Sequence, residues 1–307
     1  MTYLHRIFKL LVVTSVLLSV IAVAGPRTGQ AIAGGAGLSD PSALKVHEGS
    51  MKITTDGTVI ENLEIRGTLR IEAQNVVVRN VWVYTSAPWT IYVKGGSATF
   101  DHIEIGNAAV PGERGIGGSN IVVRNANIHH VEDGIKLGSN TVYSGVRVHS
   151  LASPNASPHA DAVQVEGTTK NAVIKNSVLD STGAVGKGNA AIFVKSDLGA
   201  QSNITFQNNY LNGGNYMIYV RDGGNGMPKN VRFIGNRLGD TYRYGITRLN
   251  GPVEWTNNSW ASTGEFIDVK GNVIGTGTTQ APTTTQAPTT TQAPTTTQAP
   301  TTTQAPT

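Results

Sequence analysis

Two short acidic segments hold the residue types best suited to chemistry. Residues 132–136 (EDGIK) and 159–164 (HADAVQ) each place an aspartate, Asp133 or Asp161, two positions before an aliphatic side chain. In equivalent strands these carboxylates would stack and repel each other unless a cation or a proton lay between them. They are therefore candidates for an acid/base pair or, with Glu166 as an outlying ligand, for a calcium site. Alternatively, the aspartates cap a turn by accepting hydrogen bonds from backbone amides.

The elements that would position these segments follow from an internal repeat. Nine stretches, such as VVRNVWV at residues 77–83, share one frame whose central residue is asparagine in six cases. β-Branched residues dominate the stretches, most of the 36 glycines lie between them, and neither helical periodicity nor a leucine-rich-repeat pattern is present. The central positions lie 18 to 32 residues apart and are Asn62, Asn80, His102, Asn125, Gly145, Asn176, Asn208, Gly235 and Asn257.

This repeat predicts an all-β fold, a parallel β-helix of about nine coils over residues 49–275. Short strands stacked in parallel, 4.7–4.9 Å apart, satisfy both backbone pairing and burial. We expect the central asparagines to line one bend, because asparagine tolerates the left-handed backbone conformation. Their amides are expected to form hydrogen bonds with neighbours in the coils above and below.

The nine-fold frame and the segments at 132–136 and 159–164 resemble the pectate-lyase-like β-helix superfamily. The resemblance implies a right-handed parallel β-helix and favours a polysaccharide lyase that cleaves a uronate-containing glycan by β-elimination. Fold alone does not determine the reaction. A non-catalytic carbohydrate-binding or adhesion protein stays open, as does a glycoside hydrolase that uses Asp133 and Asp161 as its carboxylate pair.

Aligning the second strand of each coil predicts a core column and, one residue later, a column of outward side chains. We expect this outward column to bind the substrate, because aromatic rings stack on sugars and cations bind uronate carboxylates. The alternative is an ordinary solvated sheet face with cross-strand aromatic pairs. The predicted substrate-binding residues are Tyr92, Lys136, Gln164, Phe193 and Tyr219.

Three side chains near this column are catalytic candidates. As the resemblance implies, Lys195 would be the base that abstracts the proton beside the uronate carboxylate, and Arg221 would bind that carboxylate or exchange roles with Lys195. His159, two residues before Asp161, is the third candidate. The adjacent histidines at 129–130 would point to opposite sides of a strand, which argues against a joint metal site.

The two ends of the chain indicate export. Residues 1–24 combine a basic start, an apolar run and a small-residue site, as a signal peptide does, so we expect a secreted, extracellular protein. Residues 25–48 would form an N-terminal cap region. Residues 276–307 repeat TTTQAP and bury too little apolar surface to fold, which predicts a disordered Thr/Pro-rich tail.

Composition narrows the expected partners. The chain has no cysteine, so neither disulfides nor thiol chemistry contribute. The net charge of +4 comes partly from the leader, and no run of Lys or Arg occurs, which argues against nucleic acid. We expect a monomer that binds a polysaccharide and meets a membrane only through its signal peptide.

Overall fold

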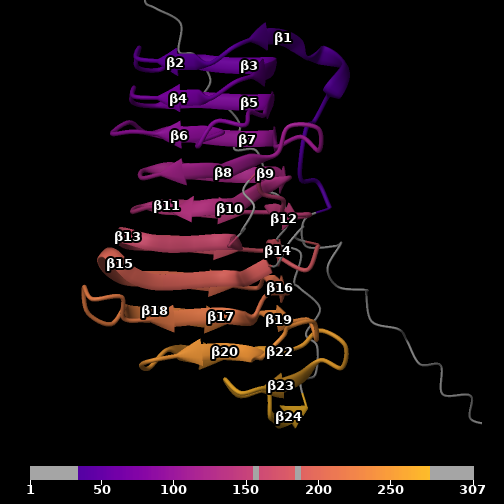
Figure 1. Ribbon diagram of the computed structural model, residues 1–307, viewed down its shortest axis with the longest axis vertical. Coiled ribbons are helices and arrows are strands. Elements are labelled where there is room, and N and C mark those ends of the chain that lie inside the picture. Colours follow the sequence, from indigo (N-terminus) through magenta and orange to yellow (C-terminus); the bar gives the residue numbers. More distant parts are fainter. Residues whose placement is uncertain (1–33, 155–158, 184–187, 277–307) are drawn as a thin grey trace, which may run out of the picture. The chain divides into compact units, whose positions relative to one another are not determined.

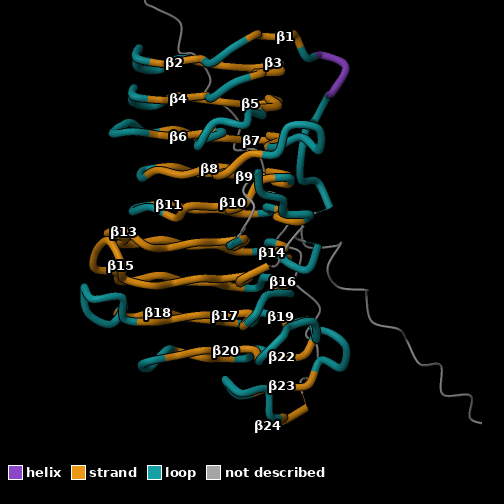
Figure 2. The backbone as a smooth tube through the Cα atoms, viewed as in Figure 1, coloured by secondary structure: helices purple, strands orange, loops and turns teal. Residues whose placement is uncertain are grey.

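The computed structural model describes residues 34–154, 159–183 and 188–276. Among them the chain winds into a parallel β-helix whose coils stack in sequence order (Figure 1). Strands and loops make up nearly all of these residues, and the only helix described is the short 3-10 helix η1 (Pro41–Ala43) (Figure 2). The all-β prediction is therefore confirmed. The expected signal peptide and the tail from residue 277 onward lie outside the described residues.

Each coil contributes short strands to three faces. The first face contains β2 (Met51–Ile53), β4 (Leu69–Ile71), β6 (Ile91–Val93), β8 (Gly112–Gly118), β10 (Val131–Leu137), β17 (Tyr216–Arg221) and β20 (Gly245–Leu249). The second face contains β11 (Thr141–Ser144), β18 (Lys229–Ile234) and β21 (Glu254–Thr256). The third face contains β1 (Lys45–Glu48), β12 (Arg147–His149), β14 (Val178–Asp180), β16 (Tyr210–Asn212), β19 (Arg237–Leu238) and β22 (Ser259–Trp260).

Longer strands continue around the corners between faces. Two of them, β13 (Ala160–Lys175) and β15 (Gly188–Gln207), run from the first face into the second. Four others run from the second face into the third and are β3 (Val59–Arg66), β5 (Val76–Val83), β7 (Ala98–Ile105) and β9 (Ile121–His129). Strands of one face pair in parallel from coil to coil, which satisfies their backbone groups, and register shifts interrupt the pairing of β13 with β15.

The nine central positions of the repeat form the bend between the second and third faces. All nine are left-handed, with φ between 49° at Asn80 and 66° at Gly145. Asparagine and glycine adopt this conformation at little cost, which explains why they recur there. The predicted bend is confirmed.

The amide ladder expected at these positions is found mainly one residue further along the chain. Asn80 donates to Asn62 (Nδ2–Oδ1 2.8 Å), but Asn176 is exposed. By contrast, Asn209 donates to Asn236 (Nδ2–Oδ1 3.1 Å), and Asn236 donates to Asn258 (2.9 Å). These three amides are at most 1% exposed, and their side chains also form hydrogen bonds with backbone N–H and C=O groups.

A second, exposed row of asparagines lies at the corner between the first and second faces, and the sequence analysis did not identify it. Its members have φ between 51° and 59°, and each Nδ2 donates to the Oδ1 of the preceding member over 2.8–3.2 Å. The row consists of Asn120, Asn140, Asn171, Asn203 and Asn230.

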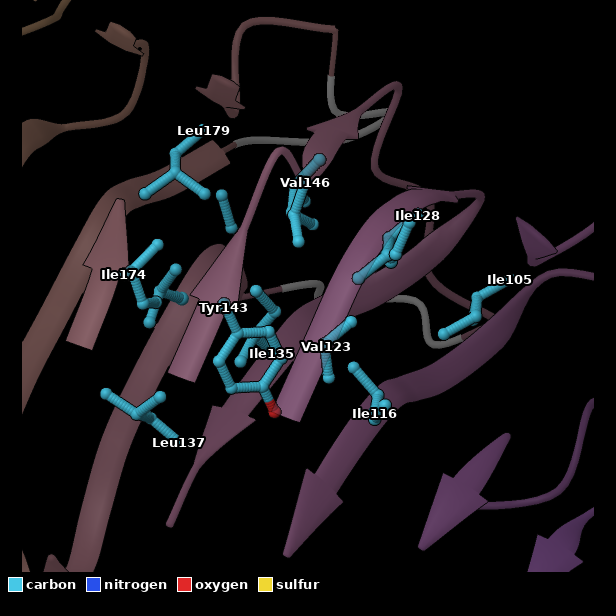
Figure 3. Close-up of a cluster of buried hydrophobic side chains, with 14 of the residues drawn as sticks. Ile105, Ile116, Val123, Ile128, Ile135, Leu137, Tyr143, Val146, Ile174 and Leu179 are labelled. Atoms are coloured by element: carbon cyan, nitrogen blue, oxygen red, sulfur yellow. The ribbon is translucent and has the colours of Figure 1, made fainter. Parts of the chain in front are cut away.

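The interior is apolar and receives side chains from all three faces. Figure 3 shows Ile116 and Ile135 of the first face pointing toward Tyr143 and Ile174 of the second. All four are fully buried, and each of the three isoleucines contributes about 1.5–3 kcal/mol relative to an exposed one. This core fixes the register of the coils and therefore the spacing of their outward-pointing side chains.

The two ends of the stack are closed differently. At the start, β1 pairs in parallel with β3 and follows η1, whose N-cap Asp40 accepts from the backbone N–H of Ser42 (3.0 Å). At the end, β22 is followed by two antiparallel strands, β23 (Glu265–Ile267) and β24 (Val273–Thr276). No helix among the described residues is long and apolar enough to span a membrane.

Candidate functional site

Strict alternation of side chains breaks down at the start of the first-face strands. A Cβ on Gly134 would lie 2.5 Å from Cγ1 of Val148, in the core, and the next residue, Ile135, is also buried in the core (Figure 3). Asp133 and Lys136 flank these two inward positions and both point outward, with Lys136 Nζ 3.5 Å from Asp133 Oδ2. Each strand therefore opens with an outward–inward–inward–outward frame.

This four-residue frame recurs through seven coils in register. The first outward column consists of Trp89, Arg114, Asp133, Asp161, Ala190, Tyr216 and Gly245. The second consists of Tyr92, Gly117, Lys136, Gln164, Phe193, Tyr219 and Arg248. We call these two columns the candidate face. It includes all five residues that the sequence analysis assigned to substrate binding.

The aspartates occupy the middle of the candidate face and are almost completely buried. Asp161 is fully buried and Asp133 is 9% exposed. Asp161 accepts hydrogen bonds from Asn189 (Nδ2–Oδ1 2.8 Å) and Gln164 (Nε2–Oδ2 3.2 Å). Asp133 accepts one from the backbone N–H of Asp161 (3.2 Å). Asp133 thus accepts from the strand of the next coil, whereas Asp161 is held by side chains, and neither bond caps a turn.

Burial raises the pKa of both carboxyl groups, because a low-dielectric site disfavours their charged forms. At Asp133 the charge of Asp161 adds to the effect of burial, and Lys136 offsets only part of it, so the pKa rises to about 7. Two acids in contact titrate as a pair. The pair therefore keeps a proton to a higher pH than ordinary aspartates do.

His159 connects this buried pair to the outside. Its side chain is 56% exposed, and its Nδ1 lies 3.5 Å from Oδ2 of Asp161. The hydrogen bond to Asp161 raises the pKa of His159, and partial burial opposes that rise. The ring also meets the edge of Phe193, with centroids 5.5 Å apart. A histidine that a carboxylate orients through Nδ1 can exchange protons through Nε2, as general bases do.

Lys136 supplies positive charge beside the pair. Its ammonium lies 2.8 Å from Oε2 of Glu166 and 3.5 Å from Oδ2 of Asp133, and only 17% of the side chain is exposed. The predicted metal ligands Asp133, Asp161 and Glu166 are therefore gathered in one place, but a lysine lies between two of them. The chain itself provides the cation that stacked carboxylates require.

This donor set does not fit calcium. Both oxygens of Asp161 accept from amides, and those of Asp133 face a backbone N–H and the Lys136 ammonium. No group of three or more His, Cys, Asp or Glu side chains within the described ranges is arranged to hold a metal ion. Calcium stays a prediction of the sequence, and no chemical step is assigned to it.

Lys195 and Arg221 lie two residues past the aromatic positions, in register with each other in neighbouring coils. Lys195 Nζ is 2.8 Å from Oδ1 of Asp197, and Arg221 Nε donates to Oδ1 of Asn250 (2.8 Å). Both belong to the first face, as expected, but each is paired with a side chain outside the acidic centre. Among the three catalytic candidates, it is His159 that contacts the aspartate pair.

Aromatic groups extend the candidate face in both directions from the aspartates. On one side, Trp89 and Tyr92 stack with ring centroids 4.6 Å apart. On the other, Phe193 contacts Tyr219 at 5.3 Å, and Tyr219 contacts Tyr216 at 5.5 Å. An acidic centre between two aromatic surfaces suits an extended ligand that spans several coils.

Sequence reasoning missed several of these residues. Trp89 and Arg114 each stand three positions before a residue of the second column, so comparing residues 89–92 with residues 133–136 would have found the first column. Asn189 left no such signal, because its role depends on the side chain of Asp161 in the preceding coil.

The prediction that the histidines at 129–130 point apart is wrong. His130 adopts a φ of 50°, which turns its ring toward His129, and their Nδ1 atoms lie 2.6 Å apart. His129 Nε2 is also hydrogen-bonded to Glu104. This cluster belongs to the third face, away from the aspartates.

Comparisons with known proteins agree with this architecture. No family model matches the sequence, and no curated protein matches it. Among solved structures, an alginate lyase from Paenibacillus sp. str. FPU-7 superposes with a TM-score of 0.51 at 15% identity, over 76% of this chain and 93% of that one. The chain therefore shares the parallel β-helix fold of that alginate lyase. A pectate lyase, Pel9A, is also similar, with a TM-score of 0.42 at 14% identity over 69% of this chain and 64% of that one.

Proposed function

We propose that this lyase-like β-helix is a polysaccharide lyase that cleaves a uronate-containing glycan on the candidate face. The observation that carries the proposal is the contact between the exposed His159 and the buried Asp161, which two amides hold in place. That arrangement lies between aromatic surfaces that suit sugar rings. The similar structure of an alginate lyase makes alginate the first polymer to test.

In β-elimination the base removes the proton on the carbon next to the uronate carboxylate. His159 takes this proton on Nε2, and the electron pair of the broken C–H bond forms the new carbon–carbon double bond. The bond to the glycosidic oxygen breaks at the same time, and that oxygen takes a proton from water. The ammonium of Lys136 lies at the centre and stabilises the charge that develops on the carboxylate. Lys195 and Arg221 bind carboxylates of sugars further along the chain.

The direct test is an incubation of the full chain with alginate, polygalacturonate and neutral glycans, measured for ultraviolet-absorbing unsaturated ends and for reducing ends. Both should appear together, and only with uronates. Because the pKa of His159 is raised and the base acts unprotonated, activity should increase with pH through a midpoint above 6.5. If none of the uronate-containing polymers yields unsaturated ends, the protein is not a lyase for these substrates.

The variant His159→Ala should lower the rate 10²- to 10⁴-fold, the usual contribution of a general base. A matched control is His102→Asn, because His102 also contacts an aspartate (Nδ1 to Asp101 Oδ1, 3.0 Å) but lies at the bend. His102 is left-handed, and asparagine occupies the same position in other coils. The control should retain full activity, and equal losses in both variants would contradict the assignment.

One observation favours a second candidate, a glycoside hydrolase. A carboxyl group whose pKa is raised to about 7, as at Asp133, is what a general acid for glycosidic oxygen needs. However, the second carboxylate must flank the sugar at a distance, and Asp161 is fully buried directly beside Asp133. Reducing ends without unsaturated ends would identify the hydrolase, and binding without either product would identify a binding protein.

A further inference from the structure

Trp89, Tyr92 and Arg114 form a compact cluster on the candidate face, one to two coils before Asp133. Besides the stack of Trp89 on Tyr92, the guanidinium carbon of Arg114 lies 5.4 Å from the centroid of the Trp89 ring. Arg114 Nη1 also donates to the carbonyl oxygen of Pro88 (3.3 Å), which ties it to the loop that carries Trp89. The three side chains are therefore positioned together, although they come from two coils.

Gly117 makes room for this cluster. A Cβ at position 117 would lie 2.6 Å from Cζ3 of Trp89, and 3.0 Å from Cβ of Lys136. The indole ring thus lies over a glycine in the second outward column, and the stem of Lys136 at the acidic centre borders the same glycine. The cluster is continuous with the site of the proposed reaction.

The chemistry of the cluster suits one residue of an acidic sugar. Both hydrogen bonds that Arg114 makes within the described residues leave from Nη1, so Nε and Nη2 can donate to a planar carboxylate. Glu113 lies 3.3 Å from Arg114 Nη1 and neutralises part of its charge, but 35% of the arginine side chain is exposed. The aromatic pair beside it offers the apolar surface on which a pyranose ring packs.

We propose that Trp89, Tyr92 and Arg114 form a distal subsite for one uronate residue of the glycan, in which Arg114 binds the carboxylate and the aromatic pair packs against the ring. This subsite rests on the proposed function for its ligand class. Neighbouring strands are about 4.8 Å apart, so the subsite begins about 5–10 Å from the aspartates. It therefore adds affinity to long oligosaccharides and none to those that fill the centre alone.

Calorimetry on the full chain tests the subsite without turnover when every protein also carries His159→Ala. The probes are hexamers and dimers of mannuronate and of galacturonate, together with the same hexamers after reduction of their carboxylates to alcohols. Arg114→Gln should weaken the binding of the uronate hexamers at least tenfold and leave the binding of the reduced hexamers unchanged. Trp89→Ala should weaken the binding of both kinds of hexamer, and neither variant should change the affinity for the dimers.

Matched controls separate the subsite from general damage. Arg124→Gln removes an exposed arginine from β9, and Gly167→Ala adds a methyl group where nothing lies within 4 Å. Neither should change hexamer affinity, whereas Gly117→Ala should weaken it by displacing Trp89. If Trp89→Ala fails to fold, Trp89→Leu and Gly117→Ala replace it.

The subsite is overturned if Arg114→Gln and Gly117→Ala bind the uronate hexamers like their parent, or if the parent binds no uronate. It stands if Arg114-dependent binding is found even though the wild-type chain forms no unsaturated product, in which case the lyase reaction alone fails. Conversely, if the wild-type chain forms unsaturated product but Arg114→Gln and Gly117→Ala leave the hexamer affinity unchanged, the subsite is refuted and the proposed lyase reaction is not.

Discussion

Two pairs of side chains in this β-helix are stacked one coil apart and have opposite properties. Asn209 and Asn236, beside the bend, are buried amides that bond each other and nearby backbone groups. Asp133 and Asp161, on the candidate face, are buried carboxyls of nearly the same size and shape. Only the replacement of an NH₂ group by an oxygen distinguishes the two kinds of side chain.

That replacement decides what the stack can do. An amide donates and accepts, so a column of amides satisfies itself and can be repeated from coil to coil. An ionised carboxylate only accepts, so two adjacent carboxylates need a proton or a cation between them. Here the raised pKa of Asp133 favours the bound proton, and Lys136 is the cation. Amide stacking stabilises the fold, whereas carboxylate stacking leaves a proton and an ion pair available for chemistry.

Within these two pairs, the largest expected effect on activity comes from making the acidic pair resemble the amide pair. Asp161→Asn should lower lyase activity at least 100-fold, about 2.7 kcal/mol in the activation barrier, because His159 loses the carboxylate that orients it. The melting temperature should change little, because Gln164 can turn its amide so that its buried Oε1, for which no bond is described, accepts from the new NH₂ group. Retained activity with a shifted melting temperature would show that Asp161 serves only the fold.

The converse change should cost stability. Asn236→Asp removes a donor from the amide column and leaves the carbonyl oxygen of Phe206 without its hydrogen bond, so unfolding should become easier by about 3 kcal/mol at pH 8. At pH 4 the loss should shrink, because the carboxyl can then be protonated. The control Asn230→Asp lies in the exposed row, where water replaces lost bonds, and should change stability by less than about 1 kcal/mol.

The comparison also shows where sequence reasoning succeeded and where it could not. The nine-fold frame predicted the bend because a left-handed φ restricts residue type, and that restriction is visible in every coil from Asn62 to Asn257. It placed the amide ladder one residue too early, since Asn208 and Asn209 are neighbouring asparagines in one polar run. Only burial separates the two.

Asp133 and Asp161 were identified as a pair because their segments are alike. Their direction could not be predicted, because strict alternation would place them with Ile135 in the core. The structure avoids this by turning Gly134 inward as well, next to Val148 of another face. Such a contact between faces has no counterpart in local sequence, and neither does the hydrogen bond from Asn189 to Asp161.

A smaller effect is expected from pH. The pKa of Asp133 is raised in the folded state, so folding takes up a proton between the ordinary value near 4 and about 7. Stability should therefore be highest below pH 4 for this group alone and should decrease by about 1–3 kcal/mol as pH rises to 7. Chemical denaturation at pH 5 and pH 8 should show the decrease, and Asp133→Asn should largely remove it. An equal pH dependence in the variant would assign the effect to other groups.

The smallest expected effect is that of chelation. Because Lys136 already lies between Asp133 and Glu166, EDTA should change neither the melting temperature nor the rate of product formation. Added calcium should likewise leave both unchanged. Inactivation by EDTA that calcium reverses would restore the metal role that the acidic residues suggest from sequence.

The outward–inward–inward–outward frame affects how the candidate face can evolve by substitution. The two inward residues of each frame carry the packing, so exchanging the two outward residues changes contacts on the candidate face but not the core. Tyr216 and Tyr219 occupy the same frame positions as Asp161 and Gln164, only two coils away. Each coil can thus present a different pair of outward residues on the same core. The insertion or deletion of a whole coil would lengthen or shorten the polymer-binding surface by one coil and leave the acidic centre intact.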